Sequence, residues 1–298
     1  MRAVAFSEFG AAPALTDLPV PQPGPGEVLV RVRASSVNGF DLGVLGGYLK
    51  GTYEYEFPVV LGKDFAGHVE SVGDGADFHP GDDVFGVVMR PTLGQGGFAE
   101  YVVVNAQYGI ARIPDGLDHA RAGALGLAGT AARNAVDAVQ PTPGETVLIS
   151  GATGGVGAFA VQLAATRGAE VIATARSGAE AAFVTAVGAT HAVHPDDLKT
   201  LAPVHAAIHL AGDGATVARR VTPGGRFATT VHHVPDDPAI TSTAIMADPN
   251  PATLAALADD VVAGRLRVPL AGVYDLADTT RAVEDFTRGT VGKLAVTI

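Results

Sequence analysis

The sequence predicts an α/β protein that combines a doubly wound parallel sheet with a second, β-rich domain. Three observations carry this prediction: the chain has 298 residues, its first 115 or so residues alternate short β-rich runs with Gly and Pro, and from about residue 120 helical and buried-strand patterns alternate. A single core usually organises about 100–150 residues, so two domains are expected. With 47% hydrophobic and 17% charged residues, the chain can bury a sizeable core.

The first part of the chain is predicted to be a compact β-rich domain. Its candidate strands are residues 3–6, 28–34, 68–72, 84–88 and 101–104. Residues 19–26 contain four prolines, which lack the amide donor that a central strand needs. This segment is therefore expected to be an extended surface connection.

The second part is predicted to be a parallel β/α domain, because candidate strands are separated by about the length of a crossover helix. The predicted elements are a helix over 120–139, a strand over 146–150, a helix over 156–167, strands over 170–174, 206–210 and 226–231, and a plausible edge strand over 241–247. A last strand over 293–298 is expected to return to the first domain.

The bulk properties exclude several classes of partner. A formal charge of −11, with scattered Lys and Arg, argues against binding to nucleic acid or to an anionic membrane. Ser7 and Glu8 interrupt the amino terminus before a secretory signal develops, and the absence of Cys fits a reducing compartment, so a soluble cytoplasmic protein is expected. Residues 146–166 carry no charge, but their four glycines would weaken a spanning helix, which favours a buried strand instead.

A glycine-rich run, GATGGVG at residues 151–157, follows the predicted strand and opens the predicted helix. Backbone amides at a helix N-terminus attract the pyrophosphate of a dinucleotide, and glycines let the chain approach it closely. The alternative is a turn that only packs the helix on the strand. The predicted cofactor contacts are Ala152, Gly154, Gly155, Val156 and Gly157, with Ala152 replacing the first fingerprint glycine and therefore requiring a negative φ.

The end of the second predicted strand favours NADPH over NADH. A site specific for NAD usually has Asp or Glu there, whereas this chain has Arg176 and Ser177. Arg176 can pair with the 2′-phosphate, and Ser177 can donate a hydrogen bond to it. The alternative is a solvated arginine at a strand end.

These motifs resemble those of the medium-chain dehydrogenase/reductase family, specifically its zinc-independent quinone oxidoreductase branch. The resemblance covers the whole chain, with landmarks at residues 23–32 (PGPGEVLVRV), 38–41 (NGFD), 61–73 (LGKDFAGHVESVG), 96–102 (GGFAEYV), 151–163 (GATGGVGAFAVQL) and 291–298 (VGKLAVTI). It implies a GroES-like catalytic domain of residues 1–116 and 265–298, a Rossmann NADPH-binding domain of residues 117–264, and a homodimer formed through the edge of the Rossmann sheet.

The same resemblance predicts no metal. Zinc-dependent relatives use a Cys, the His of a Gly-His-Glu motif and a further Cys, Asp or Glu, whereas this chain has Gly62-Lys63-Asp64 and no Cys. His205 and His209 would stand about 13 Å apart on one strand, and His232 and His233 would point to opposite faces, so neither pair is suited to chelation. Structural or surface roles are expected for these histidines.

Carried over residue by residue, the resemblance predicts Asn38 and Asp41 at the floor of the active-site cleft, with Tyr48 nearby. Tyr48, Asn38 or Lys63 would donate a hydrogen bond to the developing oxygen anion of the acceptor. The alternative for Asn38 and Asp41 is to cap a short helix that starts near Phe40, and both roles are compatible.

Further cofactor contacts are implied at Thr130, at Leu210 and Ala211 after a strand end, and at Arg288, which matches an arginine that binds the 2′-phosphate. Two departures predict weaker or differently arranged NADPH binding: the lysine of the family falls near Glu180, and its adenine-stacking tyrosine falls near His194-Pro195.

Without a metal or an evident acid–base pair, the predicted reaction is direct hydride transfer from NADPH to an acceptor that is already electron-poor. Quinone reduction is the leading hypothesis, and reduction of an enone or enoyl double bond is the second. The alternative from another class is a non-catalytic protein that senses NADPH or has a structural or RNA-binding role. The acidic balance argues against RNA binding.

Overall fold

The computed structural model describes residues 1–231 and 233–298 and divides the chain into two compact units. The first unit comprises Met1–Leu127, Pro249–Ala263 and Leu270–Ile298, and the second comprises Ala128–Asp248 and Gly264–Pro269. Each is described by itself.

The first unit is built mainly from β-structure. Its strands are β1 (Arg2–Phe6), β2 (Ala14–Asp17), β3 (Glu27–Ser36), β4 (Glu54–Tyr55), β5 (Val59–Val60), β6 (Asp64–Val72), β7 (Asp83–Val87), β8 (Thr92–Leu93), β9 (Tyr101–Asn105), β10 (Ile110–Arg112), β17 (Leu270–Asp275) and β18 (Lys293–Thr297). Its helical elements are α1 (Gly39–Leu45), α2 (His119–Ala122), α7 (Pro251–Val262), the 3-10 turn η2 (Leu276–Asp278) and α8 (Thr279–Thr287).

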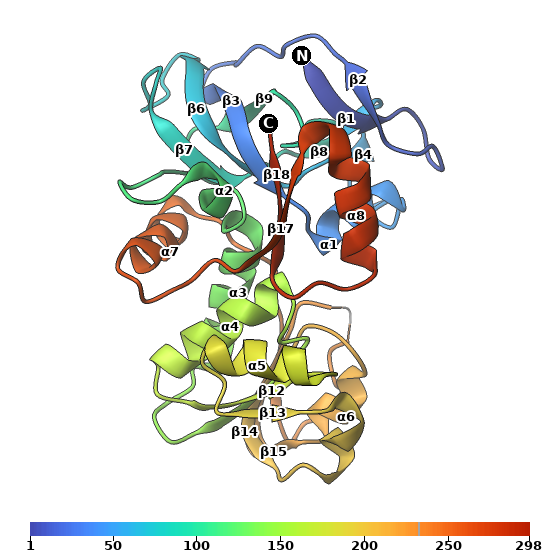
Figure 1. The fold of residues 1–298 in the computed structure, drawn as a ribbon, viewed down its shortest axis with the longest axis vertical. Helices are drawn as coiled ribbons and strands as arrows, with labels where there is room; N and C mark the ends of the chain where they lie inside the picture. Colours follow the sequence, from blue (N-terminus) through green and yellow to red (C-terminus); the bar gives the residue numbers. More distant parts are fainter. Residues whose placement is uncertain (232) are drawn as a thin grey trace. The chain divides into compact units, whose positions relative to one another are not determined.

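A seven-stranded sheet forms the centre of this unit, in the order β10-β7-β6-β3-β18-β17, with β9 also paired to β3. β18 pairs antiparallel with β3, so the carboxyl-terminal strand lies beside a strand from the start of the chain (Figure 1). The returning tail predicted from the sequence is confirmed.

The alternation of side chains along β3 explains why it forms a central strand. Val30 and Val32 are buried in the core, whereas Arg31 and Arg33, which alternate with them, are exposed. Burying one such valine contributes about 1.5–3 kcal/mol, so a register slip of one residue would place arginines in the core.

The second unit contains one six-stranded sheet. Its strands are β11 (Thr146–Ser150), β12 (Glu170–Thr174), β13 (His191–Val193), β14 (Val204–His209), β15 (Val221–Thr229) and β16 (Thr241–Ala244), and its helical elements are α3 (Gly126–Val139, which begins in the first unit), α4 (Gly155–Thr166), α5 (Gly178–Ala186), η1 (Pro195–Thr200) and α6 (Gly214–Ala218).

All strand pairs of this sheet are parallel, and their order β13-β12-β11-β14-β15-β16 is that of a doubly wound dinucleotide-binding sheet. The predicted fold class is therefore confirmed. The strand order reverses between β11 and β14, which is where such sheets bind their ligands. β16 lies at the edge, as predicted.

The single helix predicted over residues 120–139 is wrong, because the chain forms two helices there, α2 and α3. The chain turns between them at Gly123–Leu125, and a Cβ atom on Gly126 would lie 2.7 Å from the carbonyl oxygen of Gly86 and 2.9 Å from Asp64 Oδ1. The periodicity of the sequence did not indicate this turn, because alanine and glycine are compatible both with a continuous helix and with a turn between two helices.

Residues 146–166 divide into β11 and α4, which agrees with the strand predicted in place of a membrane-spanning helix. Among the described residues, no helix has the length and apolar character required to cross a bilayer.

Candidate functional site

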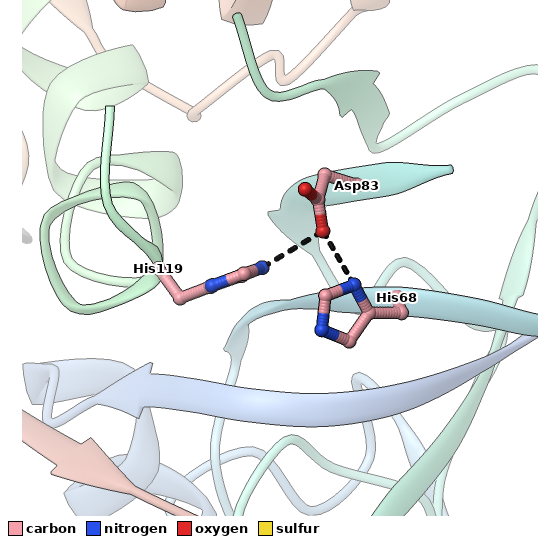
Figure 2. Close-up of side chains that lie close together, drawn as sticks. All are labelled: His68, Asp83 and His119. Carbon is pink, nitrogen blue, oxygen red and sulfur yellow. Dashed lines mark hydrogen bonds and ion pairs between the residues drawn. The ribbon is translucent and has the colours of Figure 1, made fainter. Parts of the chain in front are cut away.

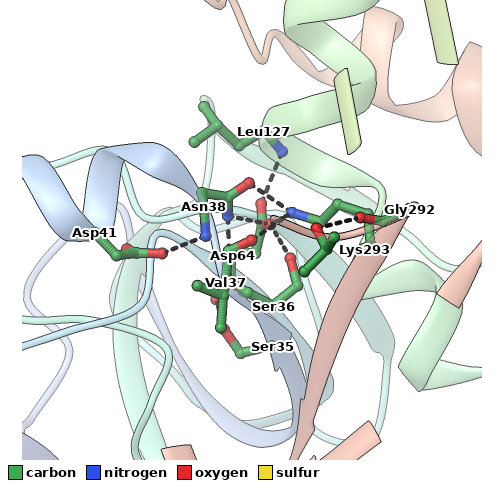
Figure 3. Close-up of polar contacts among 10 residues, drawn as sticks. Ser35, Ser36, Val37, Asn38, Asp41, Asp64, Leu127, Gly292 and Lys293 are labelled. Atoms are coloured by element: carbon green, nitrogen blue, oxygen red, sulfur yellow. Dashed lines mark hydrogen bonds and ion pairs between the residues drawn. The ribbon is translucent and has the colours of Figure 1, made fainter. Parts of the chain in front are cut away.

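A buried carboxylate, Asp64, lies at the centre of a polar cluster in the first unit (Figure 3). Its Oδ2 atom accepts hydrogen bonds from Ser36 Oγ at 2.5 Å and Asn38 Nδ2 at 2.8 Å, and its Oδ1 atom accepts one from the backbone N–H of Leu127 at 2.7 Å. We call Ser36, Asn38, Asp64 and Lys293 the Asp64 cluster. Its carboxylate is 0% exposed, so these partners replace the water it loses.

Lys293 supplies the positive charge of the Asp64 cluster. Its Nζ atom donates to Asn38 Oδ1 at 2.6 Å and to the carbonyl oxygen of Val37 at 3.0 Å, and it lies 3.6 Å from Asp64 Oδ2. Burial lowers the pKa of Lys293, while Asp64 and Asp41 oppose that shift. A protonated amine offers three donors, which matches three surrounding oxygens. The three oxygens around Nζ therefore favour the protonated form of Lys293 beside Asp64, against the effect of burial.

Asn38 and Asp41 take part in the helix cap considered from the sequence. The backbone N–H of Asn38 donates to Asp41 Oδ2 at 2.8 Å, so Asp41 closes a capping interaction at the start of α1. The side chain of Asn38 turns instead into the Asp64 cluster. Burial raises the pKa of Asp41 to about 7, against the lowering effect of that backbone hydrogen bond.

Lys63 lies next to this group and is 9% exposed. Its Nζ atom is 4.7 Å from the centre of the Phe40 ring, a cation–π contact. Burial lowers the pKa of Lys63 to about 8, although Asp41 and Asp64 favour its charged form. Lys63 and Asp41 both line a hollow of about 20 Å³, room for roughly one water molecule. A lysine with a pKa near 8 can both donate a proton and recover it at neutral pH.

Tyr48 does not join these residues. It follows α1 and is 84% exposed, whereas Asn38, Asp41 and Lys63 are all buried. The structure thus brings together three of the four side chains predicted for catalysis.

The glycine-rich turn lies between β11 and α4, at the reversal of strand order. Gly154 is the N-cap of α4, so the amides of Gly155, Val156 and Gly157 belong to the first helical turn and are not needed by the helix itself. Ala152 is buried, and Gln140 is the one non-glycine residue of the described chain with a positive φ, so Ala152 meets the requirement for a negative φ.

The chain after β14 passes close to this turn. The backbone N–H of Leu210 donates to the carbonyl oxygen of Ser150 at 3.2 Å, and a Cβ atom on Gly151 would lie 2.9 Å from Cβ of Ala211. Leu210 and Ala211 therefore flank the glycine turn, as expected for residues that follow neighbouring strand ends.

Arg176 is engaged by Glu180 in the structure. Its Nε and Nη2 atoms donate to Glu180 Oε1 at 3.1 and 2.8 Å, and its backbone N–H donates to Glu180 Oε2 at 2.6 Å. Glu180, through its hydrogen bond and its charge, raises the pKa of Arg176 further. Ser177 caps α5, since its Oγ accepts from the backbone N–H of Glu180 at 3.2 Å. The Arg176 guanidinium is 60% exposed and preoriented, but its charge is partly compensated.

Two buried hydroxyls of the second unit, Thr130 Oγ1 and Ser150 Oγ, have no hydrogen-bond partner among the residues that the structure describes. An unpaired buried hydroxyl is costly unless a ligand or water completes it. Thr130 was predicted as a cofactor contact. Ser150 was not singled out from the sequence, although it is the last residue of β11, directly before the glycine turn.

Arg288 lies at the C-cap of α8 and is 70% exposed. Its guanidinium pairs with Asp285 at 2.7 Å and with Glu284 at 3.8 Å. Arg288 is thus held by acidic side chains of α8, as Arg176 is held by Glu180 of α5.

Two of the histidines considered from the sequence, His205 and His209, have local partners. His205 Nδ1 accepts from the backbone N–H of Thr146 at 3.0 Å, and buried His209 contacts Thr229 Oγ1 and the carbonyl oxygen of Gly212, both at 3.1 Å. Burial lowers the pKa of His209. The orientation predicted for His232 lies outside the described residues.

The second unit fits a dinucleotide by its own geometry. A Cβ atom on Gly154 would make only an ordinary van der Waals contact, with Gly151 O at 3.6 Å, and unused amides begin α4 directly after this residue. Such a turn can hold a pyrophosphate, while Arg176 and Ser177 stand at the strand end that would face the ribose.

Comparisons with known proteins agree with both units. Residues 24–115 match a family model described as alcohol dehydrogenase GroES-like domain, and residues 155–267 match one described as zinc-binding dehydrogenase. The first match confirms the GroES-like character of the β-rich unit.

Two curated relatives are similar over part of the chain. A chloroplastic quinone oxidoreductase of Triphysaria versicolor is 35% identical over 187 residues, covering 59% of this chain and 56% of the relative. An acrylyl-CoA reductase of Ruegeria pomeroyi is 39% identical over 194 residues, covering 62% of this chain and 54% of the relative. The chain spans about half the length of the curated relatives that it matches.

Solved structures are similar over the whole chain. The quinone oxidoreductase of Coxiella burnetii has a TM-score of 0.90 at 28% identity, covering 100% of this chain and 99% of that protein. A mycobacterial protein whose structure was solved with NADPH has a TM-score of 0.87 at 26% identity, covering 100% of both chains.

Proposed function

Because the chain belongs to the medium-chain dehydrogenase/reductase family, we propose that it uses NADPH to reduce an electron-poor acceptor, foremost a quinone, without a catalytic metal. One observation carries the metal-free reaction: Lys293 already provides the cation that faces Asp64 and Asn38. A divalent ion would meet an ammonium group rather than free ligands there.

The residues of the chain divide the work of such a reaction. NADPH, when bound, supplies a hydride from C4 of its nicotinamide ring. The amides at the start of α4 would hold the pyrophosphate, and Arg176 would hold the 2′-phosphate. Lys63 donates a hydrogen bond from Nζ to the acceptor oxygen as negative charge develops on it, and Asp41 favours the protonated form of Lys63.

The second candidate acceptor is an enone or an enoyl thioester. The acrylyl-CoA reductase among the relatives favours it, and a proton from Lys63 would serve an enolate as well as a quinol. Measuring NADPH oxidation with matched quinones and enones separates the two, since kcat/KM is expected to be higher for quinones. Tight NADPH binding with no turnover of either class would contradict the enzyme and support an NADPH sensor.

Replacing Lys63 by Met is expected to lower kcat/KM by about 10- to 150-fold at pH 7, the value of a charged hydrogen bond of about 1.5–3 kcal/mol. The protonated fraction of Lys63 falls about tenfold per pH unit above its pKa of about 8, so the native rate falls there too. When kcat/KM is measured from pH 6 to 9.5, the fall above about pH 8 should be absent in Lys63→Met. Exposed Lys199→Met is the control; a fall that persists in Lys63→Met would assign the proton to another group.

Replacing Arg176 by Ala is expected to weaken NADPH binding by about 10- to 150-fold, or about 1.5–3 kcal/mol, and to leave NADH nearly unchanged. Glu180→Gln is the matched variant, because it keeps a hydrogen-bonding side chain and removes the compensating charge. It should tighten NADPH by a few-fold. Titrating both cofactors by fluorescence tests this, and equal loss of NADPH and NADH in Arg176→Ala would refute the role.

The assembly is proposed to be a homodimer formed through the edge of the parallel sheet, where β16 pairs only with β15 among the described residues. Analytical sedimentation measures the oligomeric state of the native chain and of a variant with Ser242→Pro in the middle of β16. A monomer in the native chain would contradict the proposal.

A further inference from the structure

Two histidines and one aspartate converge on the surface of the first unit (Figure 2). His68 on β6 and Asp83 on β7 are direct cross-strand partners, so their side chains share one face of the sheet. His68 Nδ1 lies 2.5 Å and His119 Nε2 lies 3.0 Å from the same oxygen, Asp83 Oδ1. The two rings meet edge to face, with centroids 4.9 Å apart.

The third member, His119, is held by a different kind of element. It is the first residue of α2, whose N-cap Asp118 accepts a hydrogen bond from the backbone N–H of Arg121 at 2.9 Å. Two paired strands and a capped helix therefore fix the three side chains before any ligand arrives. Such preorganisation reduces the entropy cost of binding.

We propose that His68, Asp83 and His119 bind a divalent transition-metal ion such as zinc. Each offers one ligand atom, and these atoms lie within 4.8 Å of one another. Imidazole nitrogen and carboxylate oxygen are zinc ligands with bonds of about 2.0–2.2 Å, which places neighbouring ligand atoms about 3.3–3.6 Å apart in a tetrahedron. A pair of ligand atoms at the upper limit of 4.8 Å would have to approach by about 1.2–1.5 Å to reach this spacing.

The three residues are exposed enough for an ion to reach them and to keep a water molecule as a ligand. The side chains are 36%, 46% and 30% exposed, in the order His68, Asp83 and His119, so the fourth position of a tetrahedral ion faces solvent. One carboxylate leaves a bound zinc ion with a single net positive charge, which suits a protein of formal charge −11.

This site is separate from the Asp64 cluster. His68 stands four residues beyond Asp64 on β6, about 13 Å along the strand. A bound ion would join β6 and β7 to α2 and act as a structural clamp. The competing arrangement is a carboxylate that accepts hydrogen bonds from two imidazoles with no ion involved.

Two measurements on the EDTA-treated and dialysed full chain distinguish a metal site from a carboxylate that only accepts hydrogen bonds. They are calorimetric titration with Zn²⁺ and the visible absorption of added Co²⁺. We expect one saturable site per chain, weakened at least about tenfold in His68→Gln and in His119→Gln. His191→Gln is the matched control, because His191 forms a single ion pair with Glu170 at 3.1 Å, and it should bind as the native chain does.

Melting temperature gives a further measurement that does not depend on catalysis. Zinc should raise the melting temperature by a few degrees in the native chain and in His191→Gln, but not in His68→Gln or His119→Gln. Asp83→Asn, which keeps the size of the side chain, guards against misfolding and should also lose the response. No saturable binding, or equal binding in all variants, would overturn the proposal.

Discussion

Replacing Lys293 by Met is expected to lower the free energy of unfolding by about 3–5 kcal/mol. Lys293 is 2% exposed and Asp64 is 0% exposed, so the substitution leaves a buried carboxylate without its cation. Asn38 Oδ1 and the carbonyl oxygen of Val37 also lose their donor. Urea and thermal unfolding followed by circular dichroism measure the effect, with a fall in melting temperature on the order of 10 °C.

Two further variants identify the cause of that loss. Lys293→Met combined with Asp64→Asn removes both charges, and it should recover at least about half of the lost stability if the orphaned carboxylate is responsible. Lys199→Met alters an exposed lysine and should change stability by no more than about 0.5 kcal/mol. Native stability in Lys293→Met would show that the buried ion pair does not stabilise the fold.

The strongest parts of the fold were predictable because local pattern and tertiary environment agree. β11 and β12 have the bounds predicted from their apolar runs, and the glycine turn between β11 and α4 lies where the fingerprint placed it. The parallel strand order then follows from alternating strands and crossover helices. The break between α2 and α3 was not predictable from periodicity, because it depends on the close approach of Gly126 to Gly86 and Asp64.

The polar site was predictable only in part, because its partners are distant in sequence. Asn38 and Asp41 belong to one motif, whereas Lys293 lies 255 residues from Asn38 and carries no local signal beyond a lysine in an apolar strand. His68 and Asp83 meet through the register of β6 and β7, which the sequence does not specify. The pairing of Arg176 with Glu180 could have been predicted from the sequence, because an acidic residue four positions after an arginine at a helix start can reach back to it.

Replacing Gly157 by Ala is expected to abolish measurable NADPH binding, by a factor of about 10² or more, and to destabilise the second unit by about 1–3 kcal/mol. Its Cβ atom would lie 2.2 Å from the carbonyl oxygen of Gly151 and 2.6 Å from Cα of Ala152. Both are backbone atoms, so the turn or the start of α4 has to move. NADPH fluorescence titration and thermal unfolding report the two effects separately.

Gly154→Ala separates cofactor binding from packing at the same turn. Its φ of −73° suits alanine, and the nearest atom to the new Cβ is Gly151 O at 3.6 Å, so the fold should keep its native melting temperature. If the turn cradles a pyrophosphate, the added methyl group takes up room beside the amides that would bind the phosphate, and NADPH should bind at least about tenfold more weakly. If the turn only packs α4 on β11, Gly154→Ala will bind NADPH as the native chain does, while Gly157→Ala will still lose stability. The two variants therefore decide between the two hypotheses. An added methyl group clashes with the fold at Gly157 but not at Gly154, whereas the proposed pyrophosphate would contact both residues.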